Sequence, residues 1–516
     1  MKQALSLIGV SFLSVVSSLA ADKKPNIILI LADDMRASGM NFLGKEQVQT
    51  PNLDKLAGES TVFTNAHIMG GTSGAVSMPS RAMLMTGKYL YNLEKQGATI
   101  PNSHTMIGET LQKAGYNTFH TGKWHSSYEA LNRCFKEGKA IFFGGMWDHW
   151  NVPVNDYHAD GKYTHEIDFT PNFTANETPV KVRAEKINAG VHSSELFADA
   201  AADYIRGYND DAPFFMYLSF LAPHDPRTMP EKYRNMYDPE KISLPPNYAA
   251  MPAVSFDWPA KGRDENTEVY PRRPERIKQH IADYYAMISH LDDCIGRVLD
   301  ALRERGMLDD TVIVMCGDNG LAIGQHGLMG KQNVYEHSVC VPLLISGPGI
   351  PAGRVDENYV YLLDIFPTLC ELLDIPVPAS VDGKSFAGVI RGDGKAPRES
   401  LYLAFQARIR GVIAGKYKLI EYRSENLKLT QLFDLEADPW ERDNLFDAPG
   451  YDGITAELRR ELFRLRDEWE DEKNEFVRLY WEQWRRYEDA ALHGVPGPKG
   501  ASMSAQVGSW GTELKK

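Results

Sequence analysis

Three continuous apolar runs mark the first two thirds of the chain, and polar residues follow each of them. They are residues 26–32 (NIILILA), 214–221 (FFMYLSFL) and 311–315 (TVIVM). Short uninterrupted runs rich in β-branched and aromatic side chains are typical of strands buried on both faces of a parallel sheet. We therefore predict three central strands of one sheet.

Helical patterns lie between the apolar runs. Apolar residues recur every three or four positions over residues 105–114, 194–208 and 274–305. This period places them along one side of a helix, which would face the sheet. Strands that alternate with helices predict an α/β fold, with a large mixed, mostly parallel sheet sandwiched by helices.

The polar residues that follow the three runs form one predicted group. They are Asp33 and Asp34, His224, and Asp318 and Asn319. Parallel strands present their carboxyl ends at one edge of a sheet. We therefore expect these side chains to meet there despite their separation in sequence.

The pattern changes after residue 394. Short strand-like pieces bounded by turn residues lie at residues 401–405, 411–414, 417–422 and 431–435. They predict a small antiparallel sheet, and one charged amphipathic helix is predicted from about residue 455 to 491. We therefore predict a large domain over residues 22–394 and a smaller C-terminal α+β subdomain over residues 395–516. The tail after Gly494 is rich in Gly, Pro and Ser and predicts an irregular end.

The N-terminus has the three regions of a signal peptide. Lys2 precedes an apolar run over residues 4–19, and small residues follow up to Ala21. This order predicts a signal peptide over residues 1–21, recognised by the secretion machinery and then cleaved. We therefore expect a secreted or periplasmic protein without a membrane span after cleavage.

Composition limits the partners of this chain. Its 516 residues are 43% hydrophobic and 24% charged, which is typical of a globular protein. The net charge of -13 argues against broad affinity for nucleic acid or anionic lipid, so an anionic substrate would need a local basic pocket. The five cysteines are scattered and indicate neither a zinc knuckle nor a disulfide framework.

Two long motifs carry a resemblance to a known family. Residues 77–87 (SMPSRAMLMTG) resemble the sulfatase signature, which reads Cys or Ser, any residue, Pro, Ser, Arg, four residues, Thr, Gly. Residues 115–125 (GYNTFHTGKWH) resemble the second signature of the same family. Shorter stretches extend the resemblance over most of the chain, at residues 50–57, 222–226, 317–320 and 432–435. The chain therefore resembles the formylglycine-dependent sulfatases of the alkaline phosphatase superfamily.

The resemblance implies that Ser77 is the precursor of the nucleophile. In this family the Cys or Ser of the motif is oxidised to formylglycine (3-oxoalanine) and hydrated to a geminal diol. One hydroxyl of the diol attacks sulfur, and the other later expels sulfate. A Ser at this position implies maturation by an anaerobic sulfatase-maturating enzyme of the bacterial type. An engineered Cys-to-Ser substitution or an inactive homologue stays open as an alternative.

An oxygen-only set of residues predicts a metal site. Asp33, Asp34, Asp318 and Asn319 offer hard ligands that suit a divalent cation, and Ca²⁺ is the ion we predict. The resemblance adds the diol at Ser77 as a further ligand. One bound ion would polarise the sulfate ester and lower the pKa of the nucleophile.

The resemblance assigns the remaining catalytic roles to cationic residues and histidines. Arg81, Lys123 and Lys331 would bind the sulfate oxygens and supply the local basic pocket. His224 would protonate the leaving oxygen, and His125 would accept a proton as the intermediate collapses. Substrate contacts are predicted at His326, Arg227, Glu336 and His337.

These residues predict a hydrolase that removes sulfate from a sulfated carbohydrate of host mucin, glycosaminoglycan or algal glycan. Galactose or N-acetylgalactosamine sulfate is the substrate we favour, while the sugar and the sulfate position stay open. Two other activities remain as alternatives, a broad arylsulfatase and a phosphodiesterase or phosphonate hydrolase of the same superfamily. A non-enzymatic alternative is a glycan-binding homologue in which Ser77 is never modified.

Overall fold

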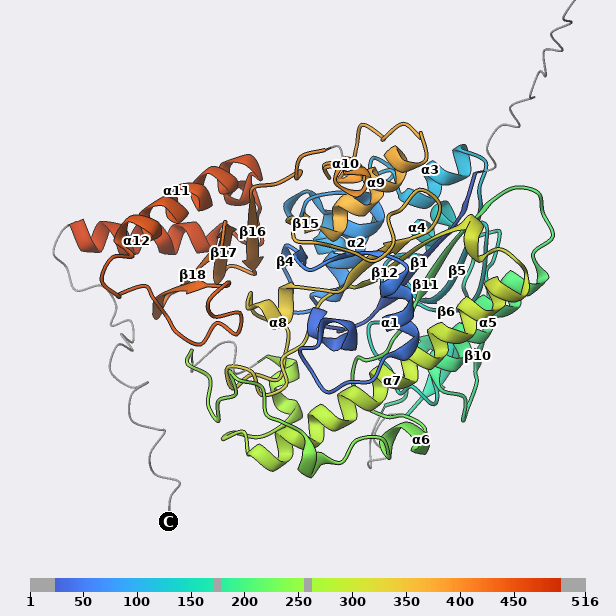
Figure 1. Cartoon of the computed structure of the whole chain (residues 1–516), viewed down its shortest axis with the longest axis horizontal. Helices are drawn as coiled ribbons and strands as arrows, with labels where there is room; N and C mark the ends of the chain where they lie inside the picture. Colours follow the sequence, from blue (N-terminus) through green and yellow to red (C-terminus); the bar gives the residue numbers. More distant parts are fainter. Residues whose placement is uncertain (1–23, 171–177, 255–261, 393, 493–516) are drawn as a thin grey trace, which may run out of the picture.

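The computed structural model describes residues 24–170, 178–254, 262–392 and 394–492 (Figure 1). The predicted signal peptide and the tail after Gly494 lie outside these residues. The centre of the fold is an eight-stranded sheet with the order β14-β2-β13-β12-β1-β11-β5-β6. Its strands are β1 (Asn26–Ala32), β2 (Thr61–Phe63), β5 (Asn117–Lys123), β6 (Glu137–Phe142), β11 (Phe214–Ser219), β12 (Thr311–Gly317), β13 (Leu343–Ser346) and β14 (Arg354–Asp356).

The sheet is mixed and mostly parallel, as predicted. β1 pairs in parallel with β11 on one side and with β12 on the other. β13 is the antiparallel member, since it runs against both β12 and β2. The register places Ala32 opposite Gly317, so β1 and β12 end at the same level. The polar residues after these strands therefore start from one edge.

Helices cover both faces of the sheet because alternate side chains of β1 enter two different cores. Ile28 and Ile30 pack in a core with α1 (Pro51–Gly58), α5 (Ser193–Gly207) and α7 (Pro274–Glu304). Ile27 and Leu29 belong to the core on the opposite face. Helices on that side are α2 (Ser77–Thr86), α3 (Ile107–Lys113), α4 (Tyr128–Cys134) and α9 (Ile365–Leu372) (Figure 1). The predicted α/β sandwich is confirmed.

The C-terminal region contains a five-stranded sheet with the order β19-β18-β17-β16-β4. Four of its strands form the predicted antiparallel meander: β16 (Ser400–Phe405), β17 (Ile409–Ala414), β18 (Tyr417–Ser424) and β19 (Leu427–Asp434). The fifth, β4 (Gly70–Gly71), comes from the segment just before α2 and pairs in parallel with β16. Leu403 and Leu462 share the core that contains Leu29, so the two predicted domains pack around common apolar side chains.

The single C-terminal helix predicted from about residue 455 to 491 is wrong. The structure has α11 (Asp452–Glu468), a 3-10 turn at Asp471–Lys473 and α12 (Leu479–Leu492). Glu470 has φ of +54°, which ends the helical path. Trp469 and Asp471 cause the break, because both side chains are buried against other segments: Trp469 packs on Tyr89, and Asp471 binds Arg410.

The remaining elements are short. They are β3 (Ala66–His67), β7 (Pro153–Val154), β8 (Glu166–Phe169), β9 (Val180–Arg183), β10 (Lys186–Ile187), β15 (Val360–Tyr361), α6 (Glu231–Arg234), α8 (Glu336–Val339) and α10 (Ala387–Arg391). The cysteines at positions 134, 294, 316, 340 and 370 are buried and free. Among the described residues, no helix combines the length and the apolar character needed to cross a bilayer.

Candidate active site

Ser77 is the first residue of α2, and it is buried at the carboxyl edge of the main sheet. Its Oγ lies 3.1 Å from Oδ1 of Asp33 and 3.0 Å from Oδ1 of Asn319. These two acceptors follow β1 and β12, so the motif serine meets the polar group that the strand pattern predicted. The partial positive charge of a helix N-terminus also favours an anion at this position.

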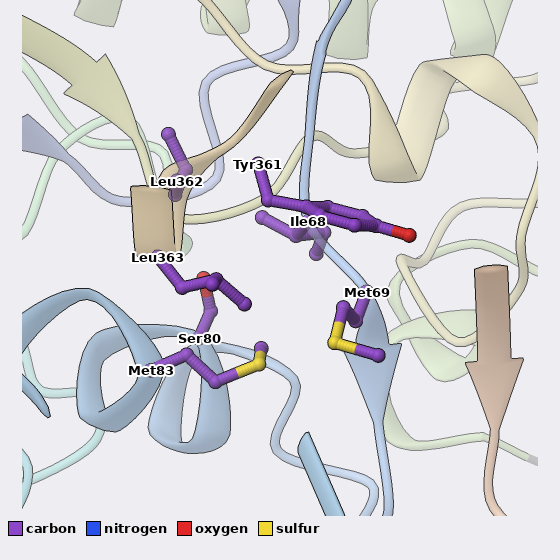
Figure 2. A pocket seen from close by; sticks show the side chains of 7 residues that line it. All are labelled: Ile68, Met69, Ser80, Met83, Tyr361, Leu362 and Leu363. Atoms are coloured by element: carbon purple, nitrogen blue, oxygen red, sulfur yellow. The ribbon is translucent and has the colours of Figure 1, made fainter. Parts of the chain in front are cut away.

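The far side of α2 packs against apolar side chains. Figure 2 shows a small pocket there, between the helix and the residues around Tyr361. Its lining consists of Ile68, Met69, Ser80, Met83, Tyr361, Leu362 and Leu363. None of these side chains is charged, so this pocket offers no site for an anionic substrate. The charged side chains of the candidate site lie instead around Ser77, at the N-terminus of the helix.

Four oxygen-bearing side chains meet beside Ser77, as the strand ends predicted. The backbone N–H of Asp34 donates to Oδ1 of Asp318 at 3.1 Å, and Nδ2 of Asn319 donates to Oδ1 of Asp34 at 2.7 Å. Asp34 has φ of +67°, a left-handed conformation that is uncommon outside glycine and turns its carboxylate into the cluster. Together with Asp33, all four side chains are buried.

The cluster fits a divalent cation. Oδ2 of Asp34 is buried and has no hydrogen-bond partner among the described residues. Carboxylate oxygens of Asp33 and Asp34 also lie within 4.8 Å of each other and of a ring nitrogen of His224. A buried carboxylate oxygen without a donor is costly, and a hard cation is the partner that such oxygens accept.

Three cationic side chains surround the same oxygens. Nζ of Lys123 contacts Oδ2 of Asp33, and Nζ of Lys331 lies 2.5 Å from Oδ1 of Asp34. Nε of Arg81 donates to Oδ2 of Asp318 at 2.8 Å. The structure thus brings the three predicted cations together from α2, β5 and the segment after β12. Each cation is paired with one of the buried carboxylates, so the cluster balances three positive charges against those of Asp33, Asp34 and Asp318.

Burial and neighbouring charges shift the pKa values of Asp33 and Asp318 in opposite directions. Burial alone would raise the pKa of Asp33, but Lys123 and Arg81 more than reverse this and hold it well below its ordinary value. Burial and the negative charge of Asp33 raise the pKa of Asp318 to about 6. Burial also lowers the pKa of the Lys123 ammonium. Asp33 therefore stays ionised, and Asp318 takes up a proton more readily than Asp33 does.

Arg81 is held by two neighbours that its motif does not include. Nη1 donates to the backbone oxygen of Lys123 at 3.2 Å and also contacts Oγ of Ser219. A Cβ at Gly122 would lie 1.9 Å from the backbone oxygen of Ser219, so only glycine permits this approach of β5 to β11. Ser219 was missed by the sequence reasoning. Its local signal was a hydroxyl within an otherwise apolar run.

His224 follows β11 and lies at the edge of the carboxylate cluster. Its Nδ1 donates to the backbone oxygen of Asp225 at 2.7 Å, which directs Nε2 toward Oδ2 of Asp34, 3.6 Å away. The backbone oxygen of His224 accepts a hydrogen bond from Nε2 of His149 at 2.9 Å. His149 belongs to no motif, and no sequence signal marked it.

His125 lies on the other side of the cluster, beyond Lys123. It has φ of +62°, and its Nδ1 is buried without a hydrogen-bond partner among the described residues. A narrow pocket beside it is lined by Arg81 and Trp124 among others. Burial lowers the pKa of the ring well below its ordinary value, and the positive charge of Lys123 adds to this. The ring is therefore neutral near pH 7.

The four predicted substrate contacts fall into two places. Arg227 lies near the site, where its Nη1 donates to Nδ1 of His280 at 3.0 Å and its Nε is buried without a partner among the described residues. His326, Glu336 and His337 lie together around α8, whose backbone contacts Gly320 directly after Asn319.

The side chains of these three residues bind partners other than the Ser77 cluster. The carboxylate of Glu336 binds His67 at 3.0 Å and Lys418 of β18 at 2.8 Å. His326 and His337 are neighbouring rings, with centroids 5.8 Å apart. No hydrogen bond or ion pair within the described part of the chain joins these three residues to Ser77. Their role as substrate contacts stays a prediction.

Comparisons with known proteins identify the family of this chain. A family model described as "Sulfatase" matches residues 25–375, and one described as "N-sulphoglucosamine sulphohydrolase, C-terminal" matches residues 324–468. The chain is 26% identical to an N-acetylglucosamine-6-O-sulfatase of Bacteroides thetaiotaomicron, over 86% of each protein. It is 28% identical to an ulvan-active sulfatase of Formosa agariphila, over 86% of this chain and 82% of that protein.

Solved structures confirm the fold. One is a protein in complex with its substrate D-glucosamine-2-N,6-O-disulfate, which superimposes with a TM-score of 0.67 at 24% identity. The match covers 88% of this chain and 99% of that one. The fold is therefore alkaline phosphatase-like. Since the sulfatase model spans well over half of its length, this chain belongs to the sulfatase family of enzymes.

Proposed function

We propose that this enzyme hydrolyses a sulfate ester of a carbohydrate with a formylglycine made from Ser77. One observation carries the proposal: Oγ of Ser77 lies within 3.1 Å of both Asp33 and Asn319, inside a buried cluster with three cations. An oxidised side chain at this position would face the groups that bind and polarise sulfate. An unmodified serine could attack sulfur but could not release the sulfate again.

The metal proposal rests on the same residues. Asp33, Asp34, Asp318 and Asn319 would hold one Ca²⁺, together with the modified residue 77. When bound, a hard cation polarises the ester and lowers the pKa of the nucleophile. The unpartnered Oδ2 of Asp34 supports this proposal, since it faces the cluster without a donor.

Arg81, Lys123 and Lys331 would bind the sulfate oxygens. All three are buried, and a buried cation interacts more strongly with developing negative charge than a solvated one does. Arg81 is held by Asp318 and Ser219, so its guanidinium is already oriented before sulfate binds. Binding of sulfate would then need little reorganisation of these side chains.

The two histidines take complementary roles in this proposal. His224 would protonate the leaving oxygen through Nε2, because Nδ1 is already committed to the backbone of Asp225. His125 would accept a proton from the modified residue 77, because a neutral imidazole offers a nitrogen lone pair and its buried Nδ1 has no hydrogen-bond partner among the described residues. Loss of the acid should matter most for poor leaving groups such as sugar alkoxides.

Galactose or N-acetylgalactosamine sulfate stays the substrate we propose, with maturation by an anaerobic sulfatase-maturating enzyme and export by the predicted signal peptide. Relatives named for N-acetylglucosamine-6-sulfate and for ulvan support a carbohydrate substrate and widen the range of sugars to test.

The test is a panel of sulfated sugars with defined sulfate positions, offered to matured enzyme. The panel covers galactose, N-acetylgalactosamine, N-acetylglucosamine and uronic acid sulfates, and mass spectrometry of the Ser77 peptide reports formylglycine. We expect the formylglycine mass and turnover of at least one sugar sulfate. An unmodified Ser77 in enzyme that releases sulfate would refute the proposed nucleophile.

A further inference from the structure

Three consecutive charged residues, Arg263, Asp264 and Glu265, lie in one 3-10 turn (Arg263–Thr267) and contact two segments of the active site, at Asp225 and at residues 329–332. We propose that this triplet is a positioning element, which holds the proposed acid His224 and the proposed sulfate-binding Lys331 in one arrangement. The proposal rests on the proposed function, since it concerns the residues that carry it out. None of the three residues belongs to a sequence motif described above.

Glu265 holds the segment that ends in Lys331. Its Oε1 accepts hydrogen bonds from the backbone N–H groups of Met329 at 3.1 Å and Gly330 at 2.9 Å. Arg272, which is fully buried, holds the other oxygen. A buried carboxylate that accepts from two successive backbone N–H groups fixes the path of the peptide. The residue after this fixed peptide is Lys331, so its direction is set by Glu265.

Asp264 connects the same segment to the loop before Ser77. Its Oδ2 accepts a hydrogen bond from Nε2 of Gln332 at 2.7 Å, and the same Nε2 lies 3.2 Å from the backbone oxygen of Gly74. Lys331 is thus flanked by two residues whose positions depend on this turn.

Arg263 acts on the other side, toward His224. Its Nη1 and Nη2 lie 3.2 Å and 3.3 Å from Oδ2 and Oδ1 of Asp225. Oδ1 of Asp225 in turn lies 3.2 Å from Nδ1 of His224. A two-pronged arginine contact restricts the rotation of a carboxylate, so Arg263 orients Asp225 and Asp225 orients the histidine. Asp264 also pairs with its neighbour Arg263. This pair joins the contacts that lead through Asp225 to His224, the Arg263 arm, to those that lead to Lys331, the Glu265 arm.

The two arms predict different kinetic changes, which a merely structural role would not produce. The Arg263 arm ends on the proposed acid, and an acid matters only for a poor leaving group. The Glu265 arm ends on a proposed sulfate-binding cation, which every sulfate ester needs. Steady-state kinetics on a sugar sulfate and on an aryl sulfate with a good leaving group therefore separate the two arms.

The experiment compares R263Q and E265Q in matured, full-length enzyme. For R263Q we expect kcat on the sugar sulfate to fall by about 10- to 100-fold, while kcat on the aryl sulfate changes by less than about threefold. R263K should recover part of the loss, because it keeps the charge but not the two-pronged contact. For E265Q we expect similar losses of about 10-fold in kcat/KM on both substrates.

Matched control variants separate positioning from stability. R206Q breaks an exposed arginine–carboxylate pair with Glu304, away from the site, and E421Q removes a buried carboxylate from β18. Both should keep wild-type kinetics on both substrates, although E421Q should lower the melting temperature as E265Q does. Formylglycine content, measured by mass spectrometry, must match in all variants.

The outcomes decide the proposal. Equal losses on both substrates for R263Q, or a loss of melting temperature without a kinetic change for E265Q, would overturn the positioning role of the respective arm. Failure of the proposed function has a different signature: S77A would then retain wild-type turnover of both substrates. If turnover depends on Ser77 but R263Q and E265Q have wild-type kinetics, the positioning role of the triplet is rejected and the proposed function stands.

Discussion

The carboxyl edge of the main sheet and the C-terminal sheet both bury charged side chains, but they satisfy them differently. In the C-terminal sheet, the carboxylate of Asp471 accepts hydrogen bonds from Arg410, Tyr402 and Trp481. At the site, Oδ2 of Asp34 and Nδ1 of His125 are buried without hydrogen-bond partners among the described residues.

The difference separates a structural network from a functional one. Buried polar groups are almost always hydrogen-bonded in folded proteins, because an unpaired one costs about 1–3 kcal/mol. A complete network such as that of Asp471 orders the chain and leaves nothing to bind. An incomplete network keeps donors and acceptors available for a ligand. Burial of charge alone would therefore have pointed to both networks, and hydrogen-bond completeness distinguishes the Asp471 network from the Ser77 cluster.

The largest expected effect tests the cluster around Ser77, whose hydrogen-bond network is incomplete. S77A should lower turnover of every sulfate ester by about 10⁴-fold or more, because the nucleophile is lost while the fold stays. S289A is the matched control, since Ser289 is a buried helical serine on α7 whose hydroxyl donates to the backbone of Gln49. Sulfate release by both variants is measured together with their melting temperatures. Substantial turnover by S77A would contradict the assignment of the nucleophile.

The next largest effect tests the network around Asp471, whose hydrogen bonds are complete. D471N should lower the free energy of unfolding by about 3–5 kcal/mol, because it leaves the buried Arg410 without its counter-charge. At temperatures where the variant is folded, kcat should equal that of the wild type. D467N is the control, because Asp467 forms an exposed pair with Arg466 and its loss should cost less than about 1 kcal/mol. Chemical denaturation and sulfate-release assays measure both quantities.

Calcium should complete the incomplete network. At a Ca²⁺ concentration about 100 times its Kd, mass action predicts about 2.7 kcal/mol of added stability, which raises the melting temperature. Chelation should reverse the shift and lower activity until Ca²⁺ is restored. D34N, which alters the carboxylate with the unpartnered oxygen, should show a much smaller shift. A melting temperature that is the same with Ca²⁺ and with chelator would reject the ion.

The smallest effect concerns histidines packed behind His224. Burial lowers the pKa of His149 to about 4, and it also lowers the pKa values of His192 and His290. Because the folded state holds these rings neutral, the unfolded state binds more protons below about pH 6.5, and stability falls as the pH falls.

A substitution isolates the contribution of one ring. H149Q should reduce the loss of unfolding free energy between pH 6.5 and pH 5.5 by about 1 kcal/mol relative to the wild type. Denaturation curves at the two pH values give the difference. An unchanged pH dependence in H149Q would show that this ring does not titrate on unfolding.

Much of the site could be predicted because its residues follow recognisable strands and motifs. Asp33 and Asp34 follow β1 directly, and β1 has the predicted bounds. Lys123, by contrast, was assigned through the family resemblance, since a lysine at the end of a strand is ordinarily solvated. The roles predicted for Glu336 and His337 rested on the resemblance of a short stretch to bacterial sulfatases, and the side chains of these residues have other partners.

The sequence by itself determined the central strands, the helices between them and the serine at the start of α2, because periodicity and motifs are local properties of the chain. Only the tertiary structure decided that Glu265 holds the segment before Lys331, that Ser219 holds Arg81, and that α11 ends where Trp469 and Asp471 are buried. These contacts join residues far apart in sequence. Their partners are chosen by the order of strands in the sheet and by the burial of polar groups, neither of which a local pattern encodes.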